Sequence, residues 1–242
     1  MIYYIYHSAF AVELEKNILI FDYYKIPKGK SEKEREFLEK YIEKTDKQVY
    51  VFSSHSHSDH FNHEILNWKN MNRNIIYVFS DDIKITKSME NVHFTHEDDR
   101  LELFSEINND KITIFTFGST DLGSSFYVNI EGKNIFHAGD LHFWHWEDDT
   151  DLEEKEMKKA YITQLQKIQK LSRINLAFTP VDPRLGKNVY EGVEIFQEML
   201  KPEVIIPMHF ADDYSAMNNK LIEKFKNKEV KIIEIKDSMS NL

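Results

Sequence analysis

The stretch VYVFSSHSHSDH, residues 49–60, is the part of the sequence that says most about the fold. Its apolar first half has the composition of a buried strand. Four possible metal ligands follow that strand, separated by small serines: His55, His57, Asp59 and His60. Loops at the carboxyl ends of strands are where α/β sheets usually carry their binding sites. The stretch therefore predicts a strand that runs directly into a metal-binding loop.

The spacing of these ligands suits one or two metal ions. His55 and His57 are two residues apart, so both side chains point to the same side of an extended segment. Asp59 and His60 are offset and are available to a second centre. The sequence has no cysteine, so imidazole and carboxylate groups must hold the metal, which suits zinc, iron or manganese. The alternative is a polar loop that is merely rich in histidine.

Composition narrows the possible partners. The formal net charge of -10 argues against a general nucleic-acid binder, because phosphate contacts need clustered Lys and Arg. It does not exclude a nuclease, since bound divalent cations offset local negative charge. No apolar run approaches the roughly 18 residues that span a bilayer, and residues 1–17 lack the basic start of a signal peptide. We expect a cytoplasmic protein with a small-molecule substrate, no nucleic-acid partner and no membrane partner; the oligomeric state stays open.

The first half of the chain reads mainly as short strands. Residues 31–43 are the exception, because their apolar side chains have helical spacing, and Ser31 with Glu34 predicts a capping box. The expected strands are residues 2–6, 10–14, 18–21, 48–52, 75–79, 92–94, 111–117, 125–130 and 134–137.

The second half alternates between helices and strands. Helices are expected at residues 152–172, 190–200 and 215–225, and strands at residues 174–178, 204–206 and 230–235. Strands first and alternation afterwards suggest an α/β protein whose strands are sandwiched between helical layers. The chain shows no internal repeat or linker, so residues 1–242 are expected to form a single domain.

The motif His-x-His-x-Asp-His after a hydrophobic strand resembles the signature of the metallo-β-lactamase fold superfamily. Two later landmarks occur in the expected order: Asp140 at the end of NIFHAGD, and His209 within VIIPMHF. The resemblance covers most of the chain and implies a four-layer αββα sandwich. The opening strand followed by His7 is also similar to a subgroup of small hydrolases that includes the ascorbate-lactonase-like proteins.

The resemblance implies which ligands would hold each of two metal ions. One metal is expected on His55 and His57, and the bridging position falls to Asp140. The second metal is expected on Asp59, His60 and His209. One or two divalent ions are implied, with zinc as the expected metal and manganese or iron as alternatives.

One landmark departs from the pattern. The superfamily usually has a third histidine for the first metal, between the first motif and the bridging aspartate. In the matching place the chain reads FGSTDLGSS, residues 117–125, without a histidine. Asp121 is expected to replace it, since carboxylate oxygens bind the same metals. The alternatives are a turn aspartate that bonds its own backbone, or a first site completed by water or filled weakly.

The segment GDLHFWHW, residues 139–146, places further candidates beside the bridging aspartate. His142 is a candidate general acid and Trp144 a wall of the substrate pocket; the alternative is that these rings close an edge of the core. Arg184 is a candidate clamp for an anionic substrate group, unless it only pairs with Asp182 in a proline-rich turn. His7 is either near the metals or structural.

These features together predict a metal-dependent hydrolase. A metal-bound hydroxide, oriented or deprotonated with help from Asp59, would cleave a small-molecule ester, lactone, amide or phosphodiester. Three alternatives stay open: a ribonuclease-like phosphodiesterase, an iron-bound redox member of the superfamily, and a metal-stabilised binding module without turnover.

Overall fold

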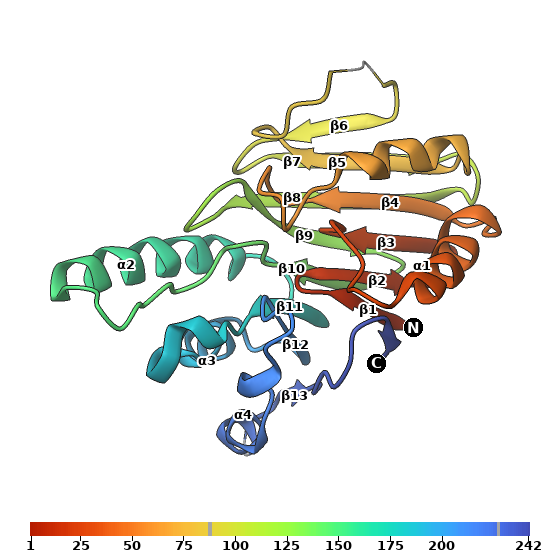
Figure 1. Ribbon diagram of the computed structural model, residues 1–242. Coiled ribbons are helices and arrows are strands. Elements are labelled where there is room, and N and C mark those ends of the chain that lie inside the picture. The colour runs from red at the N-terminus through yellow and green to blue at the C-terminus, as the bar shows by residue number, and fades with distance from the viewer. Residues whose placement is uncertain (87–88, 227) are drawn as a thin grey trace.

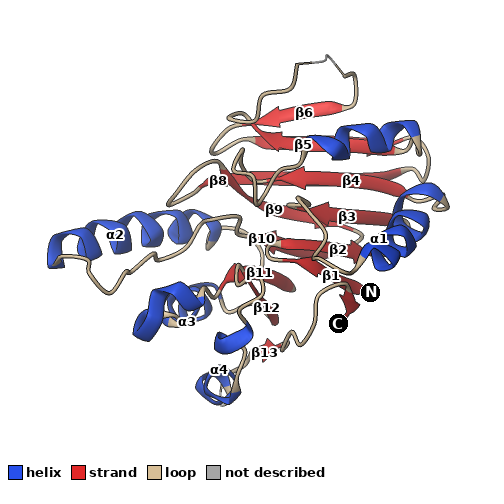
Figure 2. Cartoon of the chain, viewed as in Figure 1, coloured by secondary structure: helices blue, strands red, loops and turns tan. Residues whose placement is uncertain are grey.

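Two stacked β-sheets form the middle of the molecule, and helices cover both outer faces (Figures 1 and 2). A computed structural model describes residues 1–86, 89–226 and 228–242. The layers run helix, sheet, sheet, helix, so the expected α/β four-layer αββα sandwich is confirmed.

The first sheet has the strand order β14-β1-β2-β3-β4-β5-β6. Its strands are β1 Ile2–Tyr6, β2 Ala9–Glu13, β3 Asn17–Phe21, β4 Gln48–Ser53, β5 Ile75–Ser80, β6 Val92–Thr95 and β14 Ser240–Asn241. Its outer face is covered by α1 (Ser31–Leu38), by the π-helical turn Glu39–Glu43 that continues α1, and by a 3₁₀ segment (His63–Asn70).

The second sheet has the order β13-β12-β11-β10-β9-β8-β7. Its strands are β7 Arg100–Ser105, β8 Asp110–Gly118, β9 Ser124–Ile130, β10 Lys133–His137, β11 Leu176–Pro180, β12 Val204–Met208 and β13 Lys231–Ile232. The helices on this side are α2 (Asp151–Ile168), α3 (Glu191–Leu200) and α4 (Asn219–Phe225), with 3₁₀ segments at Pro183–Asn188 and Tyr214–Ala216.

Alternation along the strands of the first sheet separates two cores. In β4, Tyr50 and Phe52 face the second sheet, whereas Val49 and Val51 face the α1 side. Successive residues of a strand point to opposite faces, so a strand buried on both sides reads as a continuous apolar run. Residues 49–52 lie in the middle of the molecule and are buried on both faces, which explains why all four are hydrophobic or aromatic.

The parallel strands fix where the site forms. β3 and β4 run parallel in the first sheet, and β10, β11 and β12 run parallel in the second. The carboxyl ends of these strands gather along one edge of the sandwich, and the loops that follow them are free to carry polar side chains. The described residues include no helix with the length and apolar composition needed to cross a bilayer.

The ends of the described chain lie side by side (Figure 1). β14 pairs antiparallel with β1, with Tyr3 opposite Asn241. The backbone N–H of Met239 also donates to the carbonyl of Ile5. The C-terminal segment therefore closes the first sheet beside its N-terminal strand.

Several element predictions need correction. Ser31 does not cap α1, because the cap position is Lys30 and no side chain bonds the first turn; Glu34 instead accepts a hydrogen bond from the Tyr23 hydroxyl at 3.1 Å. The helix expected at residues 215–225 is divided into a 3₁₀ turn and α4, and the strand expected at residues 230–235 shortens to β13. β7 was not predicted.

A capping box does exist at the start of α2. Thr150 accepts a hydrogen bond from the backbone of Glu153, and the Glu153 carboxylate accepts one from the backbone of Thr150. Tyr161, Leu165 and Ile168 then form the buried stripe of this helix. The cap fixes where the long helix begins after the loop of residues 141–149.

Replacing Thr150 with alanine should lower the free energy of unfolding by about 1 kcal/mol, because the first turn loses its side-chain acceptor. Thr163→Ala is the matched control, since the Thr163 hydroxyl bonds the carbonyl of Lys159 within the same helix and a bond of that kind adds little to helix stability. Urea unfolding should show a lower midpoint for Thr150→Ala alone. Equal midpoints in both variants would contradict the assignment of the cap.

Candidate metal centre

Seven loops and turns bring the candidate ligands and their partners to one edge of the sandwich. From the first sheet come the β1–β2 turn with His7, the end of β3 with Asp22, and the loop after β4 with residues 55–60. From the second sheet come the β8–β9 loop with Asp121 and the ends of β10, β11 and β12, which carry Asp140, Asp182 and His209. The site therefore lies across the junction of the two sheets.

The ligand atoms form two groups. The first, here called the buried group, is His7, Asp59, His60 and His209. The second, the exposed group, is His55, His57, Asp121 and Asp140. Within each group, the ligand atoms all lie within 4.8 Å of one another, which is close enough for one ion to be bound by several of them after small adjustments.

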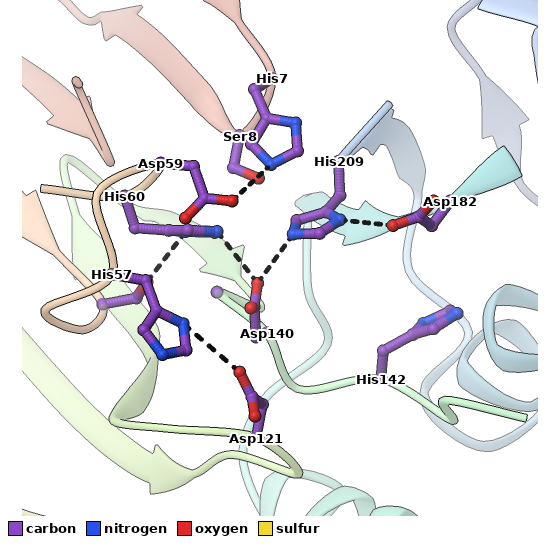
Figure 3. Close-up of polar contacts among 12 residues, drawn as sticks. His7, Ser8, His57, Asp59, His60, Asp121, Asp140, His142, Asp182 and His209 are labelled. Atoms are coloured by element: carbon purple, nitrogen blue, oxygen red, sulfur yellow. Dashed lines mark hydrogen bonds and ion pairs between the residues drawn. The ribbon is translucent and has the colours of Figure 1, made fainter. Parts of the chain in front are cut away.

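Asp140 stands between the groups (Figure 3). Its Oδ1 lies 3.2 Å from Nε2 of His60 and 3.3 Å from Nε2 of His209, and its Oδ2 lies 3.5 Å from Nε2 of His55. One carboxylate oxygen thus faces the buried group while the other faces the exposed group. This is the placement expected of a bridging carboxylate.

The buried polar atoms at this point have no hydrogen-bond partner within the described chain. They are Nε2 of His7, His60 and His209, and Oδ1 of Asp140. Leaving a buried donor or acceptor unsatisfied costs roughly 1–3 kcal/mol, and four such atoms converge here. Imidazole nitrogens and carboxylate oxygens without cysteine suit zinc, manganese or iron, so the residues fit a bound metal.

Two carboxylates stand behind the buried group and orient its histidines. Nδ1 of His60 donates to Asp22 at 2.7 Å, and Nδ1 of His209 donates to Asp182 at 2.9 Å. These contacts leave Nε2 of each ring free to face Asp140. Carboxylates in such positions fix the ring orientation and the tautomer of metal-binding histidines.

In the metal-free site, the ionisation of Asp140 and that of His209 depend on each other and on their neighbours. Burial would raise the pKa of Asp140, but the neighbouring His60 and His209 hold it well below its ordinary value. Burial would likewise lower the pKa of His209, but its close contact with Asp140 and its hydrogen bond to Asp182 raise it to about 9. Without metal, His209 therefore carries a proton at neutral pH that a metal ion would displace.

Close backbone contacts set the position of the exposed group. Gly123 has a positive φ of 72°, and a Cβ placed there would lie 2.1 Å from the carbonyl oxygen of Ser54. That oxygen accepts a hydrogen bond from the N–H of Ser124 at 2.9 Å. The loop with Asp121 thus packs directly on the strand end before His55, and Oδ2 of Asp121 lies 3.5 Å from Nδ1 of His57.

The seven predicted ligands are all brought together, and their binding of metal remains a prediction. Asp121 stands in the exposed group where the superfamily pattern has a third histidine. Sequence reasoning missed that Asp22 and Asp182 act as orienting carboxylates and left the role of His7 open. Asp22 directly follows an apolar strand, as the ligand residues after β4 do, and this position could have identified it as part of the site.

The structure sets His142 apart from both groups (Figure 3). Its ring is fully buried against Trp144 and Tyr161, and neither ring nitrogen has a partner in the described chain. Burial lowers its pKa to about 3, so the ring is neutral. A general acid needs a proton on an atom facing the substrate, and this position does not support the catalytic role predicted for His142.

Trp144 and Arg184 both reach the open side of the centre. They line a cavity of about 310 Å³ that also contacts His57, Asp140 and Trp146. The indole N–H of Trp144 donates to the carbonyl of Asp140 at 3.0 Å. Arg184 forms the expected pair with Asp182, through Nε at 3.0 Å, yet its side chain stays largely exposed at the cavity.

The likeness to solved structures shows that the two stacked sheets form the metallo-β-lactamase fold, and two clusters of potential ligands lie at the edge where the sheets meet. No family model matches the sequence. The chain is 26% identical over 229 residues to a UPF0173 metal-dependent hydrolase of Nanoarchaeum equitans, covering 84% of this chain and 80% of that protein.

Two solved structures illustrate the likeness in fold. Igni18, a metallo hydrolase from Ignicoccus hospitalis, superposes with a TM-score of 0.63 at 16% identity, over 98% of this chain and 95% of its own. YhfI, a metallo-β-lactamase fold protein from Bacillus subtilis, gives a TM-score of 0.57 at 12% identity, over 95% and 89%.

Gly123→Ala should destabilise the protein by more than the cost of a left-handed backbone alone, because the new Cβ meets the carbonyl of Ser54. Gly132→Ala is the matched control: its φ is 68°, but nothing lies within 4 Å of a Cβ there, so only about 1–2 kcal/mol of backbone strain is expected. Thermal unfolding should rank the variants in this order. Equal losses would contradict the close packing of the β8–β9 loop.

Without metal, the stability of the protein should fall between pH 6.5 and 9. The folded-state pKa of His209 is raised from 6.5 to about 9, so its stabilising contribution is complete below pH 6.5 and is lost as pH rises through 9. Denaturant unfolding of chelator-treated protein measures this decline. His209→Gln should show a flatter profile in this window, and parallel profiles would refute the raised pKa.

Proposed function

We propose that this chain is a metal-dependent hydrolase that acts on a small molecule. The observation that carries the proposal is the convergence of four unpartnered buried atoms on one point beside an open cavity. Nε2 of His60 and Nε2 of His209 lie 3.2 and 3.3 Å from Oδ1 of Asp140, yet these contacts form no hydrogen bond. A purely structural polar cluster would align such atoms into hydrogen bonds, because unmade buried hydrogen bonds are costly. The likeness to a protein described as a metal-dependent hydrolase points the same way.

The buried group and the exposed group would each hold one ion, with Asp140 shared between them. Two such ions would supply a water of lowered pKa and Lewis-acid stabilisation of developing negative charge. We infer zinc as the ion, because the buried group supplies three imidazole nitrogens, the kind of ligand that zinc favours; manganese and iron remain compatible with the carboxylates of the exposed group.

Asp59 is the side chain best placed to handle a proton. It lines both the 310 Å³ cavity and the neighbouring hollow, and its side chain is 45% exposed. Its contact with His7, 3.5 Å between Oδ2 and Nε2, holds the pKa of this carboxyl well below its ordinary range, so it stays ionised. A carboxylate in this position can orient a water or accept its proton through a second water.

The cavity defines a substrate of modest size. Its volume of about 310 Å³ is at the small end of ligand sites in proteins. Trp144 and Trp146 stack nearly parallel along its wall, and the guanidinium of Arg184 lies 5.9 Å from the ring centre of Trp146. We infer that the substrate is an ester, lactone, amide or phosphodiester with a flat apolar part and a negatively charged group.

Arg184 can bind that charged group without losing its local partner. Asp182 takes one edge of the guanidinium, and the rest of the side chain faces the cavity. The remaining N–H groups are free to donate to a carboxylate or phosphate. The acidic lining formed by Asp59, Asp121 and Asp140 makes a long polyanion such as RNA an unfavourable occupant unless metal offsets these charges.

Hydrolysis of a panel of lactones, aryl esters and a generic phosphodiester by zinc-loaded protein tests the proposal. His57→Ala should lower the rate by more than about a hundredfold, the upper range for losing a residue that only supports a ligand. His96→Ala is the matched control, because His96 lies exposed beside Asp81, outside both groups.

The pattern of results separates the alternatives. Metal-bound protein that turns over nothing on the panel, with no effect of His57→Ala, would favour a binding module. Iron found in protein purified without added metal, together with oxygen consumption, would favour a redox enzyme. Activity that is equal in His57→Ala and His96→Ala would remove the centre described above from the reaction.

A further inference from the structure

We propose that the two groups bind metal with unequal affinity: the buried group retains its ion, whereas the exposed group exchanges its ion with solvent. Metal availability would then set the fraction of molecules that hold both ions. This inference rests on the proposed function, since it concerns the same centre. It is carried by three differences between the groups: exposure, orienting partners and ligand type.

The first difference is exposure. In the buried group, the three histidine side chains are at most 8% exposed, and only Asp59 reaches water, at 45%. In the exposed group, His57 and Asp121 are 50% and 49% exposed, whereas His55 and Asp140 are buried; the difference therefore lies in these two outer ligands. Ligands open to water keep their hydration and their side-chain freedom in the metal-free state. Both must be given up on binding, which weakens the affinity.

The second difference is the support behind the ligands. His60 and His209 are each held by a buried carboxylate, Asp22 or Asp182. His57 and Asp121 contact each other at 3.5 Å, and Nδ1 of His57 lies 3.0 Å from Nε2 of His55. Within the described residues, no buried carboxylate stands behind His57. Loss of such support typically costs 10–100-fold in metal affinity.

The third difference is the type of ligand. Asp121 is a carboxylate at the position where a third imidazole is usual in this fold. The backbone of its loop is held, because the Thr120 hydroxyl bonds the carbonyl of His142 at 2.6 Å. The side chain of Asp121 extends from that fixed loop toward His57 and is half exposed (Figure 3), so an imidazole at the same position would reach the centre from the same anchor.

Asp140 links the two groups without making them equivalent. Its Oδ1 faces the supported histidines of the buried group, while its Oδ2 faces His55. Release of the outer ion would therefore leave the carboxylate held by its inner partners. The buried ion does not depend on the outer one for its ligands.

The test counts Zn²⁺ ions by native mass spectrometry of the full chain, titrated against a competing chelator. The metal-free protein should fill in two steps separated by at least about tenfold in free zinc. Gel filtration without zinc should leave one ion per chain. Two ions that bind in a single step, or that both survive gel filtration, would overturn the inference while leaving the proposed function intact. A chain that binds no zinc, manganese or iron would refute both.

Variants at residue 121 identify the step that belongs to the exposed group. Asp121→His should tighten the second step about tenfold, and Asp121→Asn should weaken it by a similar factor, with the first step unchanged. Asp148→Asn is the matched control, since Asp148 is exposed and outside both groups. A shift of the first step, or an unchanged second step in both residue 121 variants, would overturn the inference.

A variant behind the buried group gives the converse result. Asp182→Asn removes the charge that His209 and Arg184 share and should weaken the first step 10–100-fold. Should this variant fail to fold, the residue 121 variants decide alone, because the side chain of Asp121 is exposed and its replacement disturbs no buried packing.

Discussion

The buried carboxylate of Asp22 holds the end of the first sheet in the form that the site requires. It accepts the backbone N–H and the hydroxyl of Ser54, both at 2.7 Å, together with Nδ1 of His60. Burial opposes its ionisation, but His137 and His60 keep its pKa below the ordinary value. A buried charge of this kind persists only when it is fully hydrogen bonded. Ser54 in turn is the surface on which Gly123 and Gly139 pack, so one carboxylate positions the loops of both sheets.

The centre combines rigid and open parts. His7, Asp22 and His209 all have positive φ angles, a conformation that costs energy in non-glycine residues and tends to persist at functional sites. These residues belong to the inner side of the centre. The outer side consists of side chains that reach water at the cavity mouth, where Trp144 and Arg184 also lie. A substrate would approach from that side. The ligands without an orienting carboxylate behind them are therefore those that lie nearest to the bound substrate.

Much of this was predictable from local sequence. The apolar strands and the HSHSDH segment identify the sheet and its main ligands. A strand buried on both faces appears as a continuous apolar run, and neighbouring ligands appear at a regular spacing in the sequence. β7 escaped prediction because Arg100, Glu102 and other exposed side chains alternate along an edge strand. The roles of Asp22 and Asp182 depend on histidines 38 and 27 positions away, and no local pattern encodes such pairings. The capping box at Ser31 failed because Glu34 bonds Tyr23 instead.

The ligands of the buried group come from opposite ends of the chain. His7 follows the first strand, Asp59 and His60 follow the fourth, and His209 follows the twelfth. An ion held there would join the two sheets and close a loop of about 200 residues, much as a disulfide would in a chain with cysteines. Closing so long a loop removes conformational entropy from the unfolded chain. In a sequence without cysteine, metal at this edge would take the place of a disulfide between the two sheets, and resistance to heat and proteolysis would depend on the supply of metal.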